Sequence, residues 1–247
     1  MDDKKAQFQF FGSLNDFLSA SKKNGWIAYT YHEKPAIKDA IEAIGVPHPE
    51  VDVILVNGTP AQLLDPLQPD AEIEVYPLHH TTTWPSGYSL RTAIPTPPAF
   101  VLDVHLGRLV KLLRMLGLDT LYENDYTDAA IAQIAQEQER IILTRDIGLL
   151  KHRSVRWGYW LRSQQADEQL LEVIRYFDLK PYFKPFCRCL ACNGLLREVP
   201  KETVLKKLPP KTRLHFEEFF QCQTCQRVYW KGSHYERMVA FVNKIEE

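Results

Sequence analysis

The chain has 247 residues and a nearly balanced charge, with 30 Lys and Arg residues against 31 Asp and Glu residues. Hydrophobic residues make up 45% of the chain and charged residues 25%, which is ordinary for a folded globular protein. No apolar run approaches the ~20 residues of a membrane-spanning helix, and the first residues lack the apolar core of a signal peptide. We therefore expect a cytoplasmic protein with two or three domains.

The balanced total hides an uneven distribution of charge. Residues 1–80 carry a net charge of −6, whereas residues 180–247 carry a net charge of +6. A basic C-terminal region is compatible with a polyanionic partner, although charge alone does not identify that partner.

Residues 1–78 are predicted to form a small α+β domain. The expected order is strand, strand, helix, strand and strand, at residues 7–11, 26–31, 35–44, 51–56 and 73–76. This is the order of a β-grasp fold. β-grasp sulfur carriers need a free C-terminal Gly-Gly, but here the chain continues past the last strand. A docking role or an RNA-contacting role is therefore favoured over a carrier role.

Residues 79–98 are predicted to be a linker, because they are rich in threonine and proline. Proline-rich segments act as semi-rigid spacers. The adjacent His79 and His80 are expected to be solvated, since no second pair of ligands accompanies them.

Residues 99–180 are predicted to alternate strands with helices. We expect strands at 100–103, 120–122, 140–144 and 155–161, and helices at 105–116, 128–138 and 170–177. Such alternation implies right-handed crossovers and a parallel sheet. Ligands of parallel sheets bind beyond the carboxyl ends of the strands.

Three aspartates are expected near that edge of the sheet. Asp103 follows the first strand, Asp146 follows the third, and Asp128 opens the intervening helix. Asp128 alone is better explained as a helix cap. Carboxylates that converge in one crevice repel each other, and a divalent cation offsets this repulsion. The sequence therefore predicts a Mg²⁺ or Mn²⁺ site that hydrolyses a phosphodiester.

A basic stripe follows the first strand. Arg108, Lys111 and Arg114 recur at three-residue spacing on one predicted helix. The simpler interpretation is a solvated helix face, and the functional one is a surface that holds the RNA backbone. Gly107 would let backbone or substrate approach closely.

Four cysteines form the strongest motif of the chain: Cys189, Cys192, Cys222 and Cys225. Each pair has two residues between its thiols, so a tight turn can direct both sulfur atoms at one ion. Four thiolates suit a structural, tetrahedral zinc ion. Residues 181–247 are therefore predicted to form a zinc ribbon and a final helix. Cys187 is expected to be a spare thiol.

Aromatic residues accompany the last two regions. Trp230 and Lys231 follow the second cysteine pair, where they would either stack on a base or pack over the zinc knuckle. His234 would act as an acid/base group or a phosphate contact. Trp157 and Trp160 are expected to lie in a core or interface.

Longer segments of the sequence resemble a known family. Residues 100–109, 113–120, 142–146, 188–193 and 229–234 resemble the PIN-like ribonuclease family named after the C-terminal part of the Mut-seven exonuclease. Residues 45–51 and 56–58 resemble the ubiquitin-like domain that precedes it in bacterial members. The resemblance covers essentially the whole chain. It implies an α/β protein with a β-grasp domain, a PIN-like three-layer α/β domain with a parallel sheet, and a C-terminal zinc ribbon.

The resemblance also implies a metal-dependent ribonuclease that acts on structured RNA such as tRNA or rRNA. The family's acids match Asp103, Asp128 and Asp146, which would bind Mg²⁺ or Mn²⁺, and Asp119 and Asp125 are the next candidates. It remains open whether Asp125 or Asp128 reaches the metal. Arg145 falls where the family places an arginine before its acid, and would hold phosphate together with Arg108, Lys111 and Arg114. Trp230, Lys231 and His234 would contact RNA.

A second hypothesis is a non-catalytic RNA-binding adaptor, in which the zinc ribbon binds RNA and the β-grasp domain recruits a protein partner. It predicts an RNA affinity that is indifferent to divalent metal. The complete set of acids argues against this hypothesis, because a binding protein has no use for carboxylates that repel each other. A third option is a nuclease that acts on DNA, since RNA is preferred over DNA only through the resemblance.

Overall fold

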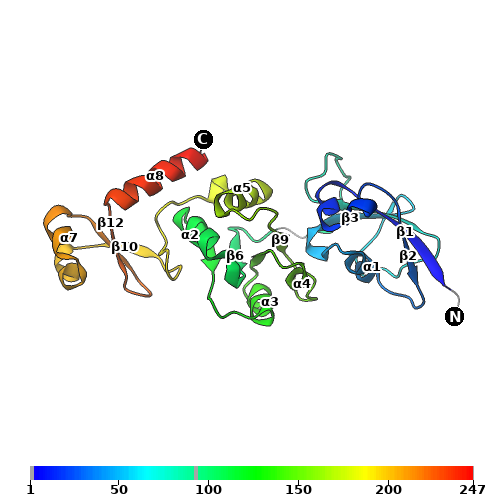
Figure 1. The fold of residues 1–247 in the computed structure, drawn as a ribbon, viewed down its shortest axis with the longest axis horizontal. Helices are drawn as coiled ribbons and strands as arrows, with labels where there is room; N and C mark the ends of the chain where they lie inside the picture. The colour runs from blue at the N-terminus through cyan, green and yellow to red at the C-terminus, as the bar shows by residue number, and fades with distance from the viewer. Residues whose placement is uncertain (1–2, 92–93, 247) are drawn as a thin grey trace. The chain divides into compact units, whose positions relative to one another are not determined.

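The computed structural model describes residues 3–91 and 94–246, and the chain forms two compact units. The first unit contains Met1–Ile94 and Thr144–Trp160, and the second contains Pro95–Leu143 and Leu161–Glu247. Figure 1 labels the elements of both units. Residues 1–2, 92–93 and 247, which fall in the predicted N-terminal domain, linker and C-terminal region, lie outside the described residues.

The first unit contains a five-stranded sheet with the order β2-β1-β5-β3-β4. Its strands are β1 (Lys4–Phe10), β2 (Ile27–Tyr31), β3 (Val51–Val56), β4 (Thr59–Pro60) and β5 (Glu72–Pro77). The first and last long strands, β1 and β5, are parallel neighbours, while the other pairs are antiparallel. Helix α1 (Ile37–Ile44) lies between β2 and β3 in the chain. This topology confirms the predicted β-grasp fold.

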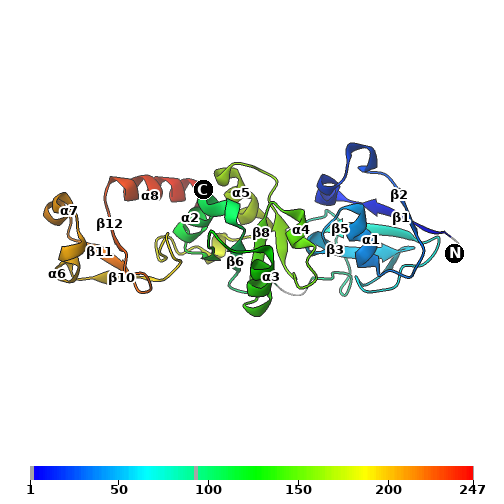
Figure 2. The same cartoon turned by 60° about the horizontal axis from the view of Figure 1, so that its bottom comes forward.

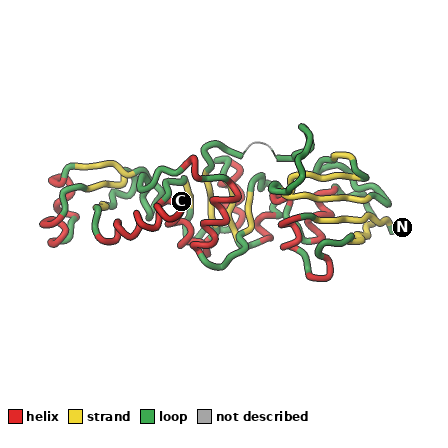
Figure 3. The backbone as a smooth tube through the Cα atoms, turned by 90° about the horizontal axis from the view of Figure 1, so that it is seen from above, coloured by secondary structure: helices red, strands yellow, loops and turns green. Residues whose placement is uncertain are grey.

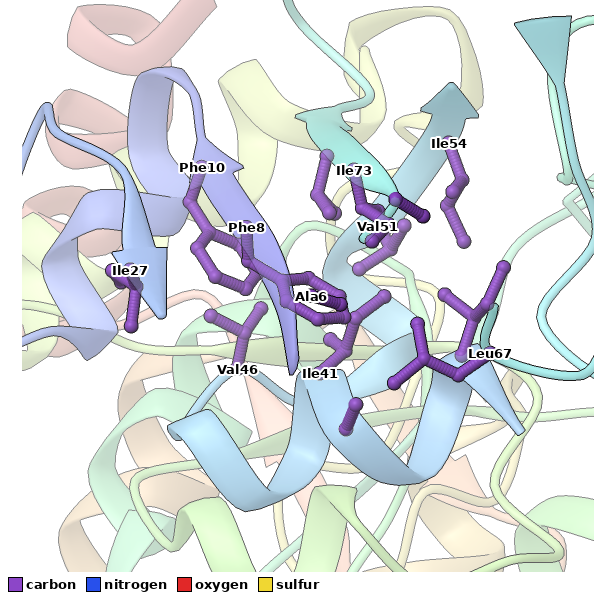
Figure 4. Packing of buried hydrophobic residues seen from close by; sticks show 14 of the residues in the cluster. Ala6, Phe8, Phe10, Ile27, Ile41, Val46, Val51, Ile54, Leu67 and Ile73 are labelled. Atoms are coloured by element: carbon purple, nitrogen blue, oxygen red, sulfur yellow. The ribbon is translucent and has the colours of Figure 1, made fainter. Parts of the chain in front are cut away.

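The core of this unit lies between α1 and one face of the sheet (Figure 4). Alternate side chains of a strand point to the same face, and Ala6, Phe8 and Phe10 of β1 are accordingly at most 1% exposed. Ile41 from α1 and Ile73 from β5 belong to the same cluster. Burying a side chain of this size contributes roughly 1.5–3 kcal/mol to stability. Alternation thus decides which face of β1 meets the core, whereas β3 is buried along most of its length.

Much of the predicted linker packs on the β-grasp domain. Trp84 lies against Tyr76, with 4.8 Å between the ring centroids, and Tyr88 stacks on Trp84. The Ser89 hydroxyl donates a hydrogen bond to an Asp52 carboxylate oxygen at 2.5 Å. These contacts attach residues 84–89 to strands β3 and β5 of the β-grasp sheet.

The second sheet has four strands in the order β7-β6-β8-β9, and a helix lies between each strand and the next in the chain. The central strand β6 (Ala99–Leu102) is parallel to both β7 (Asp119–Leu121) and β8 (Ile141–Thr144). The remaining elements are β9 (Gly158–Trp160) and helices α2 (Gly107–Met115), α3 (Asp128–Glu137), α4 (Ile147–Leu150) and α5 (Ala166–Phe177). The predicted parallel α/β sheet is confirmed. Helix α4 was not predicted, because four residues are too few for a periodic pattern.

Helix α2 turns most of its leucines inward, but Leu112, which the sequence also predicts to be buried, is half-buried. Leu109, Leu113 and Leu116 are fully buried, and α2 packs against α5. Phe100 of β6 meets Phe177 of α5 edge to face, with 5.8 Å between the ring centroids. Figure 3 shows the helices of this unit in red and its strands in yellow.

The C-terminal part of the second unit is a three-stranded antiparallel sheet, β10 (Leu196–Val199), β11 (Phe219–Cys222) and β12 (Val228–Trp230). Helices α6 (Lys201–Val204) and α7 (Pro210–His215) fold from the segment between the cysteine pairs (Figure 2). Val204, Leu208 and Phe219 form their small core. Helix α8 (Ser233–Glu246) follows. This part has the predicted zinc-ribbon fold.

Short 3₁₀ helices complete the secondary structure: η1 (Gly12–Phe17), η2 (Ala20–Lys22), η3 (His48–Glu50), η4 (Val104–Leu106), η5 (Lys180–Tyr182) and η6 (Leu205–Lys207). None of the helices in residues 3–91 and 94–246 has the length and apolar character needed to cross a membrane.

Candidate functional site

Asp103 lies at the carboxyl edge of the parallel sheet. Its backbone N–H donates to the Leu143 carbonyl of the neighbouring strand at 3.3 Å, so it continues the pairing of β6 with β8. Its side chain is only 6% exposed, and Oδ1 accepts the His105 backbone N–H at 2.8 Å. This local turn fixes the carboxylate directly beyond the strand end, where parallel sheets bind ligands.

Tyr122 supports the same turn, and the sequence analysis did not identify it. Its hydroxyl lies 2.8 Å from the Val104 carbonyl oxygen and 2.7 Å from Oδ1 of Asn124. A Cβ atom on Gly107 would lie 3.0 Å from this hydroxyl. The lack of a side chain at Gly107 therefore makes room for Tyr122, whereas the sequence predicts that it lets backbone or substrate approach. The signal that was available is the position of Tyr122 directly after β7.

Asp125 and Asp128 are both exposed near the start of α3. The N-cap of α3 is Thr127, whose side chain accepts the Ala130 N–H at 3.2 Å. The interpretation of Asp128 as a helix cap is therefore wrong, because Thr127 caps the helix. Its carboxylate lies in the first turn, where the helix dipole favours negative charge.

Asp146 follows β8 and caps α4. Its backbone N–H donates to the Thr144 hydroxyl at 2.8 Å, and its Oδ1 accepts the Gly148 N–H at 2.6 Å. The residue is exposed. Asp146 belongs to the first unit, whereas the other four candidate acids belong to the second. The expectation that Asp103, Asp128 and Asp146 share one metal ion remains a prediction.

The stretch Thr144–Trp160, which carries Asp146, is fastened to the β-grasp domain. The Trp160 backbone N–H donates to Oε1 of Glu50 at 2.7 Å, and Glu50 is fully buried. The Lys151 ammonium donates to the Glu42 carbonyl at 2.7 Å. The Trp160 indole N–H in turn donates to the Arg145 carbonyl at 3.1 Å. Residues of the β-grasp domain thus organise the turn that contains Arg145 and Asp146.

His48 is a further link between these two parts. Its Nδ1 lies 2.5 Å from a Glu42 carboxylate oxygen and its Nε2 lies 2.7 Å from the Val155 carbonyl oxygen. Burial would raise the pKa of Glu42, but hydrogen bonds from His48 and Lys38 outweigh burial and lower it. The His48 ring thus lies between a carboxylate oxygen and a carbonyl oxygen, and it joins helix α1 to the stretch Thr144–Trp160.

The basic stripe of α2 divides into exposed and buried members. Arg108 and Lys111 are exposed, but Arg114 is 2% exposed. Its guanidinium donates to the carbonyls of Thr120, Leu190 and Ala191 at 2.8–3.2 Å. Six residues correspond to about 600° of helix rotation, which places Arg114 about 120° around the axis from Arg108. The structure therefore corrects the expectation that Arg114 holds RNA.

Asp119 also has a structural role, because it is paired with basic and amide side chains. It starts β7, at the amino edge of the sheet, opposite the edge where Asp103 lies. Its carboxylate accepts from Arg140 at 2.6 Å and from Asn193 at 2.9 Å, and pairs with Arg188 at 3.1 Å. Burial would raise the pKa of Asp119, but these partners outweigh burial and lower it. The geometry corrects the expectation of a catalytic Asp119 and gives it a role in joining the sheet to the zinc ribbon.

The four cysteines are brought together into one group, with all four sulfur atoms within 4.8 Å of one another. Cys189 lies 3.6 Å from Cys225 and Cys192 lies 3.4 Å from Cys222, measured between Sγ atoms. Each pair closes a turn, through hydrogen bonds from Asn193 and Gln226 to the first cysteine's carbonyl. Such a group can hold a metal ion such as zinc, because four thiolates satisfy its tetrahedral shell.

The surroundings of the cysteines also fit a metal site. The N–H groups of Thr224 and Cys225 point at the Cys222 sulfur at 3.4 Å, as expected for a thiolate. A Cβ atom on Gly194 would lie 2.8 Å from the same sulfur, so only glycine fits there. Burial acts against ionisation of Cys189, yet hydrogen bonds, first that of the Tyr229 hydroxyl, lower its pKa to about 7. Cys187 stands outside the group.

The RNA-contacting candidates of the ribbon line two adjoining cavities. Trp230 borders both, which measure about 320 and 420 Å³. Lys231 borders the first, where its ammonium pairs with Glu218, and His234 borders the second. Trp230 also packs against the small core of the ribbon. Tyr229 borders both cavities as well, and its hydroxyl lies 3.1 Å from the Cys189 sulfur.

Comparisons with known proteins agree with this architecture. Residues 98–242 match the model of the Mut7-C RNAse domain, and residues 3–83 match the model of the Mut7-C ubiquitin domain. Searches of curated proteins and of solved structures gave no match. The first of these family models covers more than half of the chain, and the resemblance inferred from the sequence is confirmed. The chain belongs to the Mut7-C RNAse family and carries the ubiquitin-like domain associated with it.

Proposed function

We propose that this protein is a divalent-metal-dependent ribonuclease that hydrolyses phosphodiester bonds in structured RNA such as tRNA or rRNA. The observation that supports it most is the placement of Asp103, a nearly buried carboxylate held at the carboxyl edge of the parallel sheet. The match to the RNAse domain supplies the reaction class. We place the reaction in the cytoplasm, where a reducing environment keeps the four clustered thiols available for metal.

Asp103, Asp146 and one of Asp125 and Asp128 would hold Mg²⁺ or Mn²⁺, because hard cations prefer carboxylate oxygens. When bound, the ion supplies activation of water and stabilisation of the departing oxygen. The chain's own contribution is to fix these carboxylates through local turns and to hold phosphate with Arg108, Lys111 and Arg145. Trp230, Lys231 and His234 would contact RNA from the ribbon.

The four cysteines would hold a structural zinc ion. A closed shell of four thiolates leaves no open position for substrate or water. The zinc site would therefore shape the RNA-contacting surface of the ribbon and take no part in hydrolysis.

The test is cleavage of total RNA by the Asp103→Asn variant, with Mg²⁺, Mn²⁺ or EDTA, followed by mapping of the product ends. We expect the cleavage rate to fall by at least roughly 100-fold, the scale of losing a group that stabilises charge in an active site. The fold and the zinc content should not change. Asp178→Asn is the matched control, because Asp178 is exposed and adopts a left-handed conformation that asparagine tolerates. Unimpaired cleavage by Asp103→Asn would show that the acid site is wrongly assigned.

The runner-up function is a non-catalytic RNA-binding adaptor, with a protein partner on the ubiquitin-like domain. The same experiment separates the two functions. An adaptor would bind RNA equally well in EDTA and in Mg²⁺, and no RNA products would appear with the parent protein.

A further inference from the structure

A cavity of about 270 Å³ within the first unit is lined by three arginines. Arg91 comes from the segment that follows the β-grasp sheet, whereas Arg153 and Arg156 come from the stretch Thr144–Trp160. His48 of η3 also borders the cavity. Among the described residues that line it, none is acidic.

This concentration of arginine contrasts with the rest of the unit. Residues 1–90 contain no arginine, and residues 1–80 carry a net charge of −6. Residues 144–160 contain four Lys and Arg residues and a single acid, Asp146. Three of the four arginines of this unit therefore line one cavity, which favours an anionic ligand.

Several of these cations are held in place by their surroundings. The Arg91 guanidinium donates to the Pro49 carbonyl at 2.7 Å. The Arg156 guanidinium lies 4.5 Å from the centre of the Trp157 ring, within the range of a cation–π interaction. The His48 ring is held between a Glu42 carboxylate oxygen at 2.5 Å and the Val155 carbonyl oxygen at 2.7 Å. Less conformational entropy is lost when a ligand meets groups that are already ordered.

We propose that this cavity binds a phosphodiester group of the RNA backbone. Guanidinium groups present paired N–H donors that match the oxygens of a phosphate. The inference rests on the proposed ribonuclease function and extends it, because the cavity belongs to the same compact unit as Arg145 and Asp146. It gives the ubiquitin-like domain a direct part in substrate binding.

The experiment measures binding of a short, fluorescently labelled single-stranded RNA by anisotropy, at several salt concentrations. All proteins carry Asp103→Asn and are kept in EDTA, so that the RNA stays intact. The test variants are Arg153→Met and Arg153→Glu, because Arg153 is exposed and its replacement leaves the fold undisturbed. Arg175→Met, an exposed arginine of α5, is the matched control.

We expect Arg153→Met to weaken RNA binding roughly tenfold, as for the loss of one charge-assisted contact. The slope of log affinity against log salt should fall by about 0.7, the value for one phosphate contact on a single strand. Arg153→Glu should weaken binding further, and Arg175→Met should match the parent.

The outcomes separate this inference from the proposed function. If the Asp103→Asn protein binds no RNA at all, the ribonuclease function itself fails. If that protein binds RNA and Arg153→Met binds as well as Arg175→Met, the cavity proposal fails alone. The proposal is also overturned if RNA binding is unchanged while a polyglutamate peptide binds in a manner that depends on Arg153.

Discussion

Two attachments differ in kind: one joins the zinc ribbon to the parallel sheet within the second unit, and the other joins the stretch Thr144–Trp160 to the β-grasp domain within the first. Near the zinc ribbon, the buried Arg114 and the half-buried Asp119 join α2 and β7 to residues around the first cysteine pair. Near the β-grasp domain, Glu42, His48 and Glu50 hold the stretch Thr144–Trp160. The first attachment ends at the turn between Cys189 and Cys192, whereas the second depends on a histidine ring and on the carboxylates of Glu42 and Glu50.

This difference indicates what each attachment responds to. The carbonyls of Leu190 and Ala191, which accept from Arg114, lie between Cys189 and Cys192, so the order of the knuckle determines whether they are in place. The β-grasp attachment contains Glu42, whose lowered pKa means that its charge is lost only in acid. We therefore expect metal to control the first attachment and acidity to control the second.

The largest expected effect follows from removal of a zinc ligand by Cys192→Ser. Structural zinc sites contribute on the order of 10 kcal/mol of apparent binding free energy. We expect loss of zinc, unfolding of the ribbon, and exposure of Arg114 to hydrogen exchange. Zinc content and exchange of α2 measure this result. Cys187→Ser, which changes a thiol outside the group, should leave both unchanged. If α2 stays protected in the metal-free variant, the two regions are not coupled.

A smaller effect is expected when the attachment is broken without touching the metal ligands. Arg114→Met leaves the buried Thr120 carbonyl and the carbonyls of Leu190 and Ala191 without this donor, and should lower the free energy of unfolding by about 3 kcal/mol. Arg108→Met, on the exposed side of the same helix, should change it by less than about 0.5 kcal/mol. Chemical denaturation measures both. RNA affinity should fall more for Arg108→Met than for Arg114→Met. If the two variants lost equal stability, the assignment of Arg114 to the interior would be contradicted.

The smallest effect concerns acidity at the β-grasp attachment. The folded-state pKa of Glu42 lies below its ordinary value of 4.5. Its stabilisation is therefore complete above that value and is lost as the pH falls through the lower, folded-state pKa. Glu42→Gln should remove about 1 kcal/mol at neutral pH and most of the pH dependence.

Hydrogen exchange of residues 144–160, corrected for the intrinsic rate at each pH, measures this loss. Glu33→Gln, an exposed glutamate of the same unit, is the control. The role given to Glu42 would be contradicted if residues 144–160 of the parent protein were as protected from exchange below the folded-state pKa of Glu42 as at neutral pH.

The sequence predicted features that depend on near neighbours in the chain. The two-residue spacing of the cysteines identified the metal group, and period-two alternation identified strands such as β1. The sequence did not predict contacts that join distant positions. Arg114 reads as one more cation of a solvated stripe until residues 190 and 191, more than 70 positions later, are seen to accept its hydrogen bonds. Asp119 likewise resembles a catalytic acid in the sequence, because its partners Arg188 and Asn193 lie about 70 positions later in the chain.

The position of the stretch Thr144–Trp160 also affects how these modules can be separated. The RNAse family model begins at residue 98, but Val155 and Trp160 find hydrogen-bonding partners at His48 and Glu50. A fragment cut at the linker would leave those partners behind and bare the buried side chains of Val155 and Trp157. Recombination that exchanged the ubiquitin-like domain for an unrelated one would meet the same obstacle. The two modules are therefore best inherited, and expressed, as a pair.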